Sequence, residues 1–205
     1  MKVFIINGYG YENLFLKYGH EVVSELLDAD LCVFTGGEDV SPIYYGEKKH
    51  PRTYNNQLRD VEEQAYFNIC ITKEIPCVGI CRGGQFLNCL SGGKMYQHVE
   101  KHTQSHAITD IETGRKIYAS STHHQMMRGG SGSIVVATAK QNGIKEYMKD
   151  NAIIRDPVDD LDTEVLFYPL TKCLCFQPHP EFFSEDFFPL QEYFFELIQR
   201  YLVKE

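Results

Sequence analysis

The stretch IPCVGICRGGQFLN, residues 75–88, constrains the fold of this chain more than any other feature. An apolar run ends in Gly79-Ile80-Cys81-Arg82-Gly83, and residues at helical spacing follow. A G-x-C-x-G pattern at a strand-to-helix turn is the thiol counterpart of the G-x-S-x-G nucleophile elbow. The two glycines let the backbone turn sharply. The N–H groups that begin the helix, and the positive charge of Arg82, favour a thiolate. We therefore predict that Cys81 is a nucleophile.

The composition indicates one soluble domain. The 205 residues are 43% apolar and 23% charged, which suits a single core, and we predict one domain over 1–205. A net charge of −8 without a basic cluster argues against nucleic-acid binding. No apolar run reaches the roughly 18–20 residues of a membrane span. The N-terminal MKVFIING reads as a strand and turn, so we expect a cytoplasmic protein without a membrane partner.

The seven cysteines include no C-x-x-C pair, which argues against a zinc knuckle or a dithiol redox site. Most lie inside apolar segments, as small buried side chains in a reducing compartment do. Cys173 and Cys175 alternate as in a strand and are expected on one buried face. Burial alone is also the alternative interpretation of Cys81, but the flanking glycines disfavour it.

The hydrophobic pattern predicts strands and helices in alternation through the first half of the chain. Strands are expected at 2–7, 31–35 and 76–80, and helices at 11–18, 22–28, 57–74 and 82–91. Leu58, Val61 and Ile69 recur at helical spacing in the long helix. From 94 to 177 short strands predominate: KMYQ, HAIT, KIYA, SIVVAT, AIIR, EVLFY and CLCFQ. A last amphipathic helix is expected over 186–203, covering either the core or a dimer contact.

This order predicts an α/β fold: an open, mostly parallel sheet flanked by helices, with antiparallel strands added by the second half. Sites in such sheets lie beyond the carboxyl ends of the strands. Gly36-Gly37 and Cys81 both follow strands, so we expect them to meet in space.

A cysteine nucleophile needs a base and a group that orients the base. His179 and Glu181, in QPHPE, follow the apolar strand CLCF and are two residues apart. Prolines at 178 and 180 keep the backbone extended, which puts both side chains on one side. Glu181 would then fix the imidazole of His179. The triplet alone also fits a surface turn, and the upstream elbow favours the catalytic interpretation.

Attack on an amide also requires an oxyanion hole. The backbone N–H of Arg82 follows the nucleophile and is one candidate donor. Gly37, in a turn where backbone approaches a ligand closely, is the candidate second donor. A tight turn after a strand is the alternative for Gly36-Gly37.

Together, GICRGGQ, QPHPE and TGGEDVSPIYYGE resemble a class I (triad-type) glutamine amidotransferase domain, which has a flavodoxin-like fold. Within that superfamily the chain is most similar to the γ-glutamyl-γ-aminobutyrate hydrolase-like peptidases. Further matches are Arg59-Asp60 with Glu63, Leu87-Asn88 with Gly92-Gly93, and His123-His124-Gln125. The resemblance covers about residues 30–182.

The resemblance implies Cys81 as nucleophile, His179 as base and acid, and Glu181 as its orienter. It implies the backbone N–H groups of Gly37 and Arg82 as the oxyanion hole. Residues that would hold the α-amino and α-carboxylate groups of a γ-glutamyl substrate are Gln85, Thr122, His123 and His124. Gly84 replaces a larger apolar residue of the family, which would widen the pocket floor. The chain is also shorter than typical hydrolases of the family, whose additional loops shape the leaving-group side, so the resemblance does not identify the leaving group.

Other polar features predict no further site. His98, His102 and His106 would form a metal-binding stripe on a helix, but they precede a strand, so a solvated loop is expected. Arg59, Asp60 and Glu63 are expected to form a structural ion-pair network. Gly8-Tyr9-Gly10 lacks the third glycine of a dinucleotide fingerprint, and there is no phosphate-binding P-loop motif. We expect neither cofactor nor metal.

These observations predict a cofactor-free cysteine hydrolase that cleaves a γ-glutamyl amide through a thioester. The alternative is a glutaminase subunit that delivers ammonia to a separate ATP-dependent synthetase. A third interpretation, a domain that binds γ-glutamyl ligands without cleaving them, is disfavoured by the complete Cys81/His179/Glu181 set. The pattern leaves the oligomeric state open.

Overall fold

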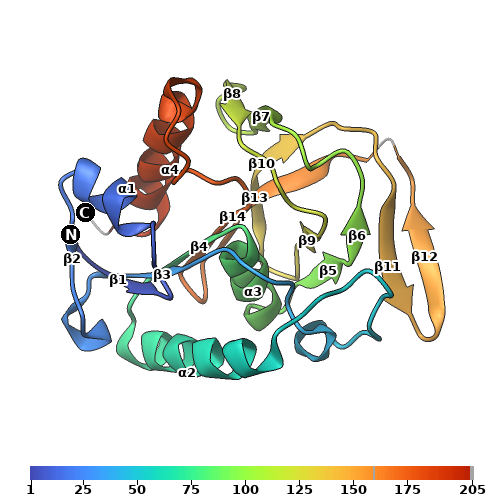
Figure 1. The fold of residues 1–205 in the computed structure, drawn as a ribbon, viewed down its shortest axis with the longest axis horizontal. Helices are drawn as coiled ribbons and strands as arrows, with labels where there is room; N and C mark the ends of the chain where they lie inside the picture. Colours follow the sequence, from blue (N-terminus) through green and yellow to red (C-terminus); the bar gives the residue numbers. More distant parts are fainter. Residues whose placement is uncertain (159, 204–205) are drawn as a thin grey trace.

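A central sheet organises the computed structural model, which describes residues 1–158 and 160–203 (Figure 1). Within those residues the sheet has nine strands in the order β2-β1-β3-β4-β14-β13-β10-β7-β8. The first five pair in parallel: β2 (Glu21–Val22), β1 (Lys2–Ile6), β3 (Leu31–Phe34), β4 (Cys77–Ile80) and β14 (Cys173–Phe176). The others are antiparallel: β13 (Asp162–Tyr168), β10 (Ile134–Ala139), β7 (His106–Asp110) and β8 (Lys116–Ala119). The predicted fold class is confirmed.

Helices cover both faces of the parallel half of the sheet (Figure 1). Helices α1 (Glu12–Lys17) and α4 (Phe188–Tyr201) lie on one face, and α2 (Gln57–Lys73) and α3 (Arg82–Leu90) on the other. Strand alternation explains the two cores. Val33 packs in the α1/α4 core, whereas its neighbour Phe34 packs in the α2/α3 core. Leu190 and Phe194 of α4 are fully buried, so this helix covers the core.

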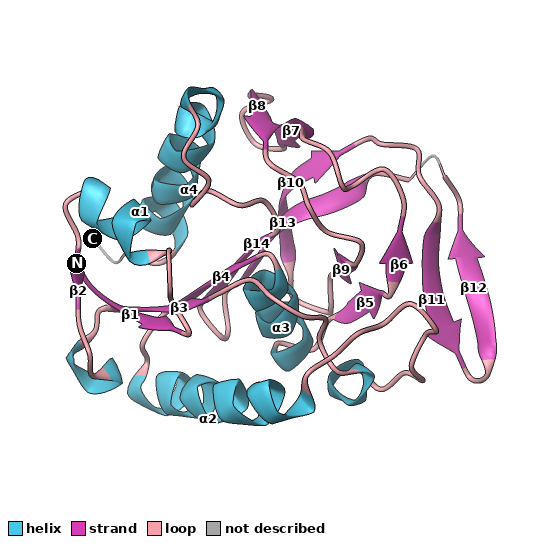
Figure 2. Cartoon of the chain, in the orientation of Figure 1, coloured by secondary structure: helices cyan, strands magenta, loops and turns pink. Residues whose placement is uncertain are grey.

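Two small sheets flank the antiparallel half (Figure 2). Strand β5 (Lys94–Tyr96) pairs with β9 (Met126–Arg128), and β11 (Lys145–Lys149) lies between β6 (His98–Val99) and β12 (Ala152–Asp156). The sequence pattern did not predict β6, β9 or β11. Strands β6 and β9 have two and three residues, too few to show a period, and their pairing is decided by distant partners.

The helix predicted over 22–28 is wrong. Strand β2 pairs in parallel with β1 there, and only a 3₁₀ turn, η1 (Leu26–Asp28), follows. Two further 3₁₀ turns lie at η2 (Pro42–Tyr45) and η3 (Glu185–Phe187). No helix in the described residues is both long and apolar enough to cross a bilayer.

Helix α2 begins and ends close to its predicted bounds but presents the opposite face to the core. Leu58 and Val61, which were expected to pack inward, are 85% and 56% exposed. The buried face instead carries Asp60, Glu63 and Phe67. Polar residues occupy this inward face because the charged side chain of Arg82 lies beneath it and pairs with both carboxylates.

The central strands align three cysteines side by side. Cys77 on β4 is in register with Cys32 on β3 and with Cys173 on β14. All three, together with Cys175, pack in the α2/α3 core, as predicted for Cys173 and Cys175. All seven cysteines are buried and unbridged.

Candidate active site

Cys81 lies at the turn between β4 and α3 with the backbone angles φ 52° and ψ −112°. These angles are unusual for a residue with a side chain, and such strain is concentrated at functional sites. The flanking glycines make the turn possible. A Cβ on Gly79 would lie 2.3 Å from the Gly83 carbonyl carbon, and one on Gly83 would lie 2.1 Å from the Phe34 oxygen. The predicted elbow is confirmed as a structural feature.

The parallel pairing of β14 with β4 brings His179 to the same sheet edge as Cys81. Phe176 aligns with Ile80, so the residues that follow both strands leave the sheet together. The His179 Nδ1 lies 2.6 Å from a Glu181 carboxylate oxygen. With Nδ1 held in this way, Nε2 is the nitrogen left to exchange a proton with the thiol.

The environment of His179 favours the protonated imidazole. Burial opposes its charge, but the Cys81 and Glu181 side chains outweigh burial and raise the pKa of His179 from 6.5 to about 10. An opposite charge within a few ångström has this effect on a buried base. His179 can therefore hold its proton near neutral pH, where it faces the Cys81 sulfur.

Ser120 holds the backbone of His179. Its hydroxyl donates to the His179 carbonyl at 2.8 Å and accepts from the His179 N–H at 2.9 Å. The ring of Phe182 stacks on the imidazole, with 4.8 Å between centroids. These contacts leave the imidazole little freedom to rotate.

The loop after β3 lies against the same pair. A Cβ on Gly36 would be 3.3 Å from His179 Cε1 and 3.8 Å from Cys81 Cβ. Neither the Gly37 N–H nor the Arg82 N–H donates a hydrogen bond to another described residue. Two free N–H groups beside a nucleophile are the arrangement that an oxyanion requires.

Arg59 anchors this loop from helix α2. Its guanidinium donates to the carbonyl oxygens of Thr35 and Gly36 at 3.1 and 3.0 Å. A Cβ on Gly37 would lie 2.0 Å from Arg59 Nη1, so a larger residue would displace this contact. Gly37 also has φ +148°, which residues with side chains rarely adopt.

The ion-pair network predicted for Arg59, Asp60 and Glu63 also includes Arg82, and it thereby joins this loop to the elbow. Glu63 accepts from Arg59 Nε at 2.7 Å and also pairs with the Arg82 guanidinium. Asp60 pairs with Arg82 and accepts from the Ser41 N–H at 3.0 Å. The expectation that Arg82 adds a positive charge at Cys81 is therefore wrong, because two carboxylates compensate that charge inside the protein.

A cavity of about 310 Å³ opens beside Cys81. Its lining includes every predicted oxyanion and substrate-binding residue: Gly37, Arg82, Gln85, Thr122, His123 and His124. Gly84 is not among the lining residues, because a Cβ there would meet the β14 backbone at 2.9 Å. The expected widening of the pocket floor is therefore not found.

Several polar groups in the cavity already have partners. The Gln85 amide group donates to the Gln125 carbonyl and to the Gln177 side chain, which leaves its oxygen free. Residues 120–125 form a loop, so His123 and His124 both line the cavity. Burial lowers the pKa of His123 to about 3, so it is neutral, whereas His124 lies 3.0 Å from Asp39.

Sequence reasoning missed three residues that position the pair. Gln177 donates to the Cys81 sulfur at 3.7 Å. It belongs to the QPHPE motif, from which only His179 and Glu181 were predicted. Tyr11 accepts from the Gly36 N–H at 3.1 Å and lies beside Glu181. Ser120 is the third, and like Tyr11 it carries no local signal, since its contact depends on distant chain segments.

The mostly parallel sheet flanked by helices is the fold of class I glutamine amidotransferases. A glutamine amidotransferase from Thermotoga maritima superposes with a TM-score of 0.60 at 16% identity, covering 100% of this chain and 86% of that one. A protein from Thermoplasma acidophilum, described as a candidate subunit of GMP synthase, gives 0.57 at 12%, covering 97% and 98%. At these identities the likeness concerns the fold alone.

The family is defined by sequence. The family model described as Peptidase C26 matches residues 13–181, and the chain belongs to this family. The glutamine amidotransferase-like YvdE homolog of Lactococcus lactis subsp. cremoris is 33% identical over 119 residues, 49% of this chain and 63% of that protein. The YvdE protein of Lactococcus lactis subsp. lactis matches equally well over 50% of its length. The chain thus spans about half to two thirds of these curated relatives. The predicted relationship to glutamine amidotransferases is confirmed.

Proposed function

We propose that this chain hydrolyses a γ-glutamyl amide bond, with Cys81 as nucleophile, His179 as acid and base, and Glu181 as orienter. One observation carries the proposal. A strained cysteine, a carboxylate-held imidazole and two free backbone N–H groups border one cavity at the carboxyl edge of the sheet. Membership of the Peptidase C26 family supports cysteine-dependent amide chemistry.

The reaction begins when the Cys81 thiolate attacks the γ-carbonyl carbon and a C–S bond forms. The oxyanion accepts hydrogen bonds from the N–H groups of Gly37 and Arg82. His179 gives its Nε2 proton to the departing amine as the C–N bond breaks, which leaves a γ-glutamyl thioester. His179 then takes a proton from water, the water oxygen attacks the thioester, and glutamate leaves as the thiolate re-forms.

The cavity offers partners for the two ends of a glutamyl group. The free oxygen of Gln85 suits an α-ammonium group, which has hydrogen-bond donors only. Polar groups of the 122–124 loop, including the Thr122 hydroxyl, suit the α-carboxylate. The substrate is thus a small molecule with a γ-glutamyl end, and no cofactor is required.

The decisive experiment measures glutamate release from glutamine, γ-glutamyl-γ-aminobutyrate and γ-glutamylputrescine. We expect turnover of at least one γ-glutamyl amine by the wild type and none by Cys81→Ala. Cys89→Ala, which changes a buried cysteine in the helix that follows Cys81, is the matched control and should remain active. Undiminished turnover by Cys81→Ala would overturn the assignment of the nucleophile.

A glutaminase subunit is the second candidate function. The fold likeness to the candidate GMP synthase component from Thermoplasma acidophilum, over 97% of this chain, favours it. Such a subunit would pass ammonia to a separate synthetase, which would be its partner. It would hydrolyse glutamine slowly and the γ-glutamyl amines not at all, so the same substrate panel separates the two functions.

A further inference from the structure

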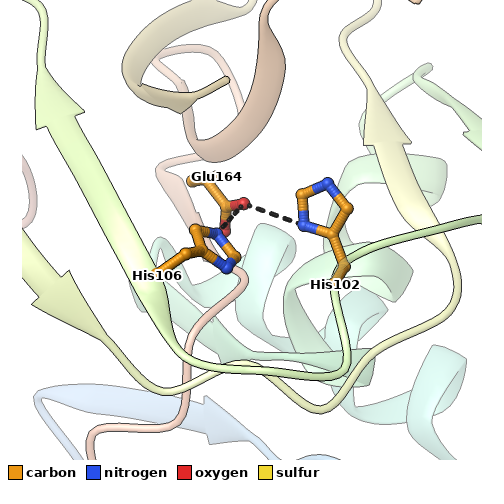
Figure 3. Close-up of side chains that lie close together, drawn as sticks. All are labelled: His102, His106 and Glu164. Atoms are coloured by element: carbon orange, nitrogen blue, oxygen red, sulfur yellow. Dashed lines mark hydrogen bonds and ion pairs between the residues drawn. The ribbon is translucent and has the colours of Figure 1, made fainter. Parts of the chain in front are cut away.

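A second polar cluster lies outside the cavity and takes no part in the proposed chemistry. His102, His106 and Glu164 converge there from the loop before β7, from β7 and from β13 (Figure 3). The solvated loop expected for these histidines is wrong, because His102 is 1% exposed and His106 is 8% exposed. Glu164 is 1% exposed. Their burial follows from the fold, which places the loop over the carboxylates of β13.

The spacing of the three side chains matches a small cation. The Glu164 Oε1 lies 3.0 Å from His106 Nε2 and 3.4 Å from His102 Nδ1. The three potential ligand atoms all lie within 4.8 Å of one another. Two ligands of a tetrahedral zinc ion, each bonded at about 2.0–2.1 Å, are about 3.3 Å apart.

Each histidine has one ring nitrogen that contacts Glu164 and one that contacts an acceptor on its other side. The contact on the far side leaves the nitrogen facing Glu164 without a hydrogen in the neutral ring. His106 Nδ1 lies 3.1 Å from the Gln104 carbonyl oxygen, which can only accept, so Nδ1 carries the hydrogen. In the neutral ring, Nε2 then presents a lone pair to the carboxylate. His102 Nε2 lies 3.4 Å from Asp162 in the same way. Outer carboxylates and carbonyls that hold histidines like this are typical of metal sites.

Several buried atoms of this cluster have no hydrogen-bond partner among the described residues. They include His102 Nδ1 and Glu164 Oε2, and also His123 Nε2 on the adjoining ring, whose centroid is 4.7 Å from that of His102. Buried polar atoms are almost always satisfied.

We propose that His102, His106 and Glu164 bind one divalent transition-metal ion of the zinc type. Two imidazoles and a carboxylate form a ligand set that suits zinc. His123 Nε2 or a water molecule would complete the coordination. The ion would be structural, because the His102 carbonyl accepts from the Ser121 hydroxyl and from the His123 N–H at 3.2 Å. It would thereby brace the loop that lines the cavity.

The test measures metal binding by the full chain. Wild-type protein is stripped with a chelator, loaded with Zn²⁺, desalted and analysed for bound zinc, and its thermal midpoint is recorded with and without the ion. We expect one equivalent and a higher midpoint, because an ion that binds only the folded state stabilises it. Glu164→Gln and His106→Gln should weaken zinc binding by more than about tenfold. Changing a residue that only supports a metal ligand already lowers affinity by about that factor, and these variants change the ligands themselves.

His20→Gln, which changes a histidine far from the cluster, should bind like the wild type. Cobalt provides a readout that needs no variant. Co²⁺ at this site should give tetrahedral absorption bands without a thiolate charge-transfer band. Absence of zinc binding by the wild type, unchanged binding in His106→Gln, or a thiolate band from the cysteines would each overturn the proposal.

Discussion

The His179 imidazole lies between a thiol and a carboxylate, and its pKa is therefore higher than that of an ordinary histidine. Burial works against the charge, but Cys81 and Glu181 raise the pKa of His179 from 6.5 to about 10. The folded chain therefore holds this proton more tightly than the unfolded chain. Its contribution to stability is complete below pH 6.5 and is lost as the pH rises to about 10.

We predict that His179 titrates at markedly lower pH in Glu181→Gln, because that variant removes one of the charges that favour the imidazolium. An NMR titration of the imidazole in both proteins measures the change. Glu185→Gln alters an exposed carboxylate nearby and should leave the curve unchanged. Identical curves for Glu181→Gln and the wild type would contradict the role of the carboxylate.

Gly37 offers a second test at the scale of one residue. In Gly37→Ala the new methyl group would collide with the Arg59 guanidinium and disturb the N–H that faces the cavity. We expect kcat to fall by about 10²–10³-fold, as when an oxyanion donor is lost, with little change in KM. Gly46→Ala changes another positive-φ glycine in open space and serves as control. An equal loss of kcat in both variants would attribute the effect to backbone strain and contradict the oxyanion role of Gly37.

At the scale of elements, helix α2 couples the elbow to the loop after β3 through buried charges. Glu63 is fully buried and pairs with both Arg59 and Arg82. We predict that Glu63→Gln lowers the free energy of unfolding by about 3 kcal/mol, because it leaves a buried guanidinium undercompensated. Urea denaturation measures this change. Glu62→Gln, exposed on the same helix, should be nearly neutral; a similar loss there would contradict the argument.

The same helix shows where sequence reasoning about elements fails. Periodicity predicted its existence and length, but a stripe of apolar residues did not identify the inward face. Leu58 lies outward because Asp60 and Glu63 are needed inside as partners of Arg82. A single sequence cannot reveal such a pairing, because the partners come from different elements.

At the scale of the whole molecule, the parallel half apart from β2 was predictable, because its other strands are apolar and most are separated by helices. The meeting of the Gly36-Gly37 turn with Cys81 followed from that topology. The two small flanking sheets were less predictable, because β6 and β9 acquire their structure only from distant partners. The burial of His102 was missed for the same reason: Glu164 and Asp162 reach it from a strand some sixty residues away. The catalytic roles of Cys81, His179 and Glu181 stay predictions.

The row of buried cysteines across β3, β4 and β14 allows unfolding of the sheet to be followed by cysteine alkylation. Cys32, Cys77 and Cys173 have no exposed surface, whereas Cys81 is 8% exposed and borders the cavity. We expect iodoacetamide to alkylate Cys81 first, and the central row only when the sheet opens. Mass spectrometry of alkylation against urea concentration would then give the opening free energy of the sheet core. Early modification of Cys77 would contradict this order.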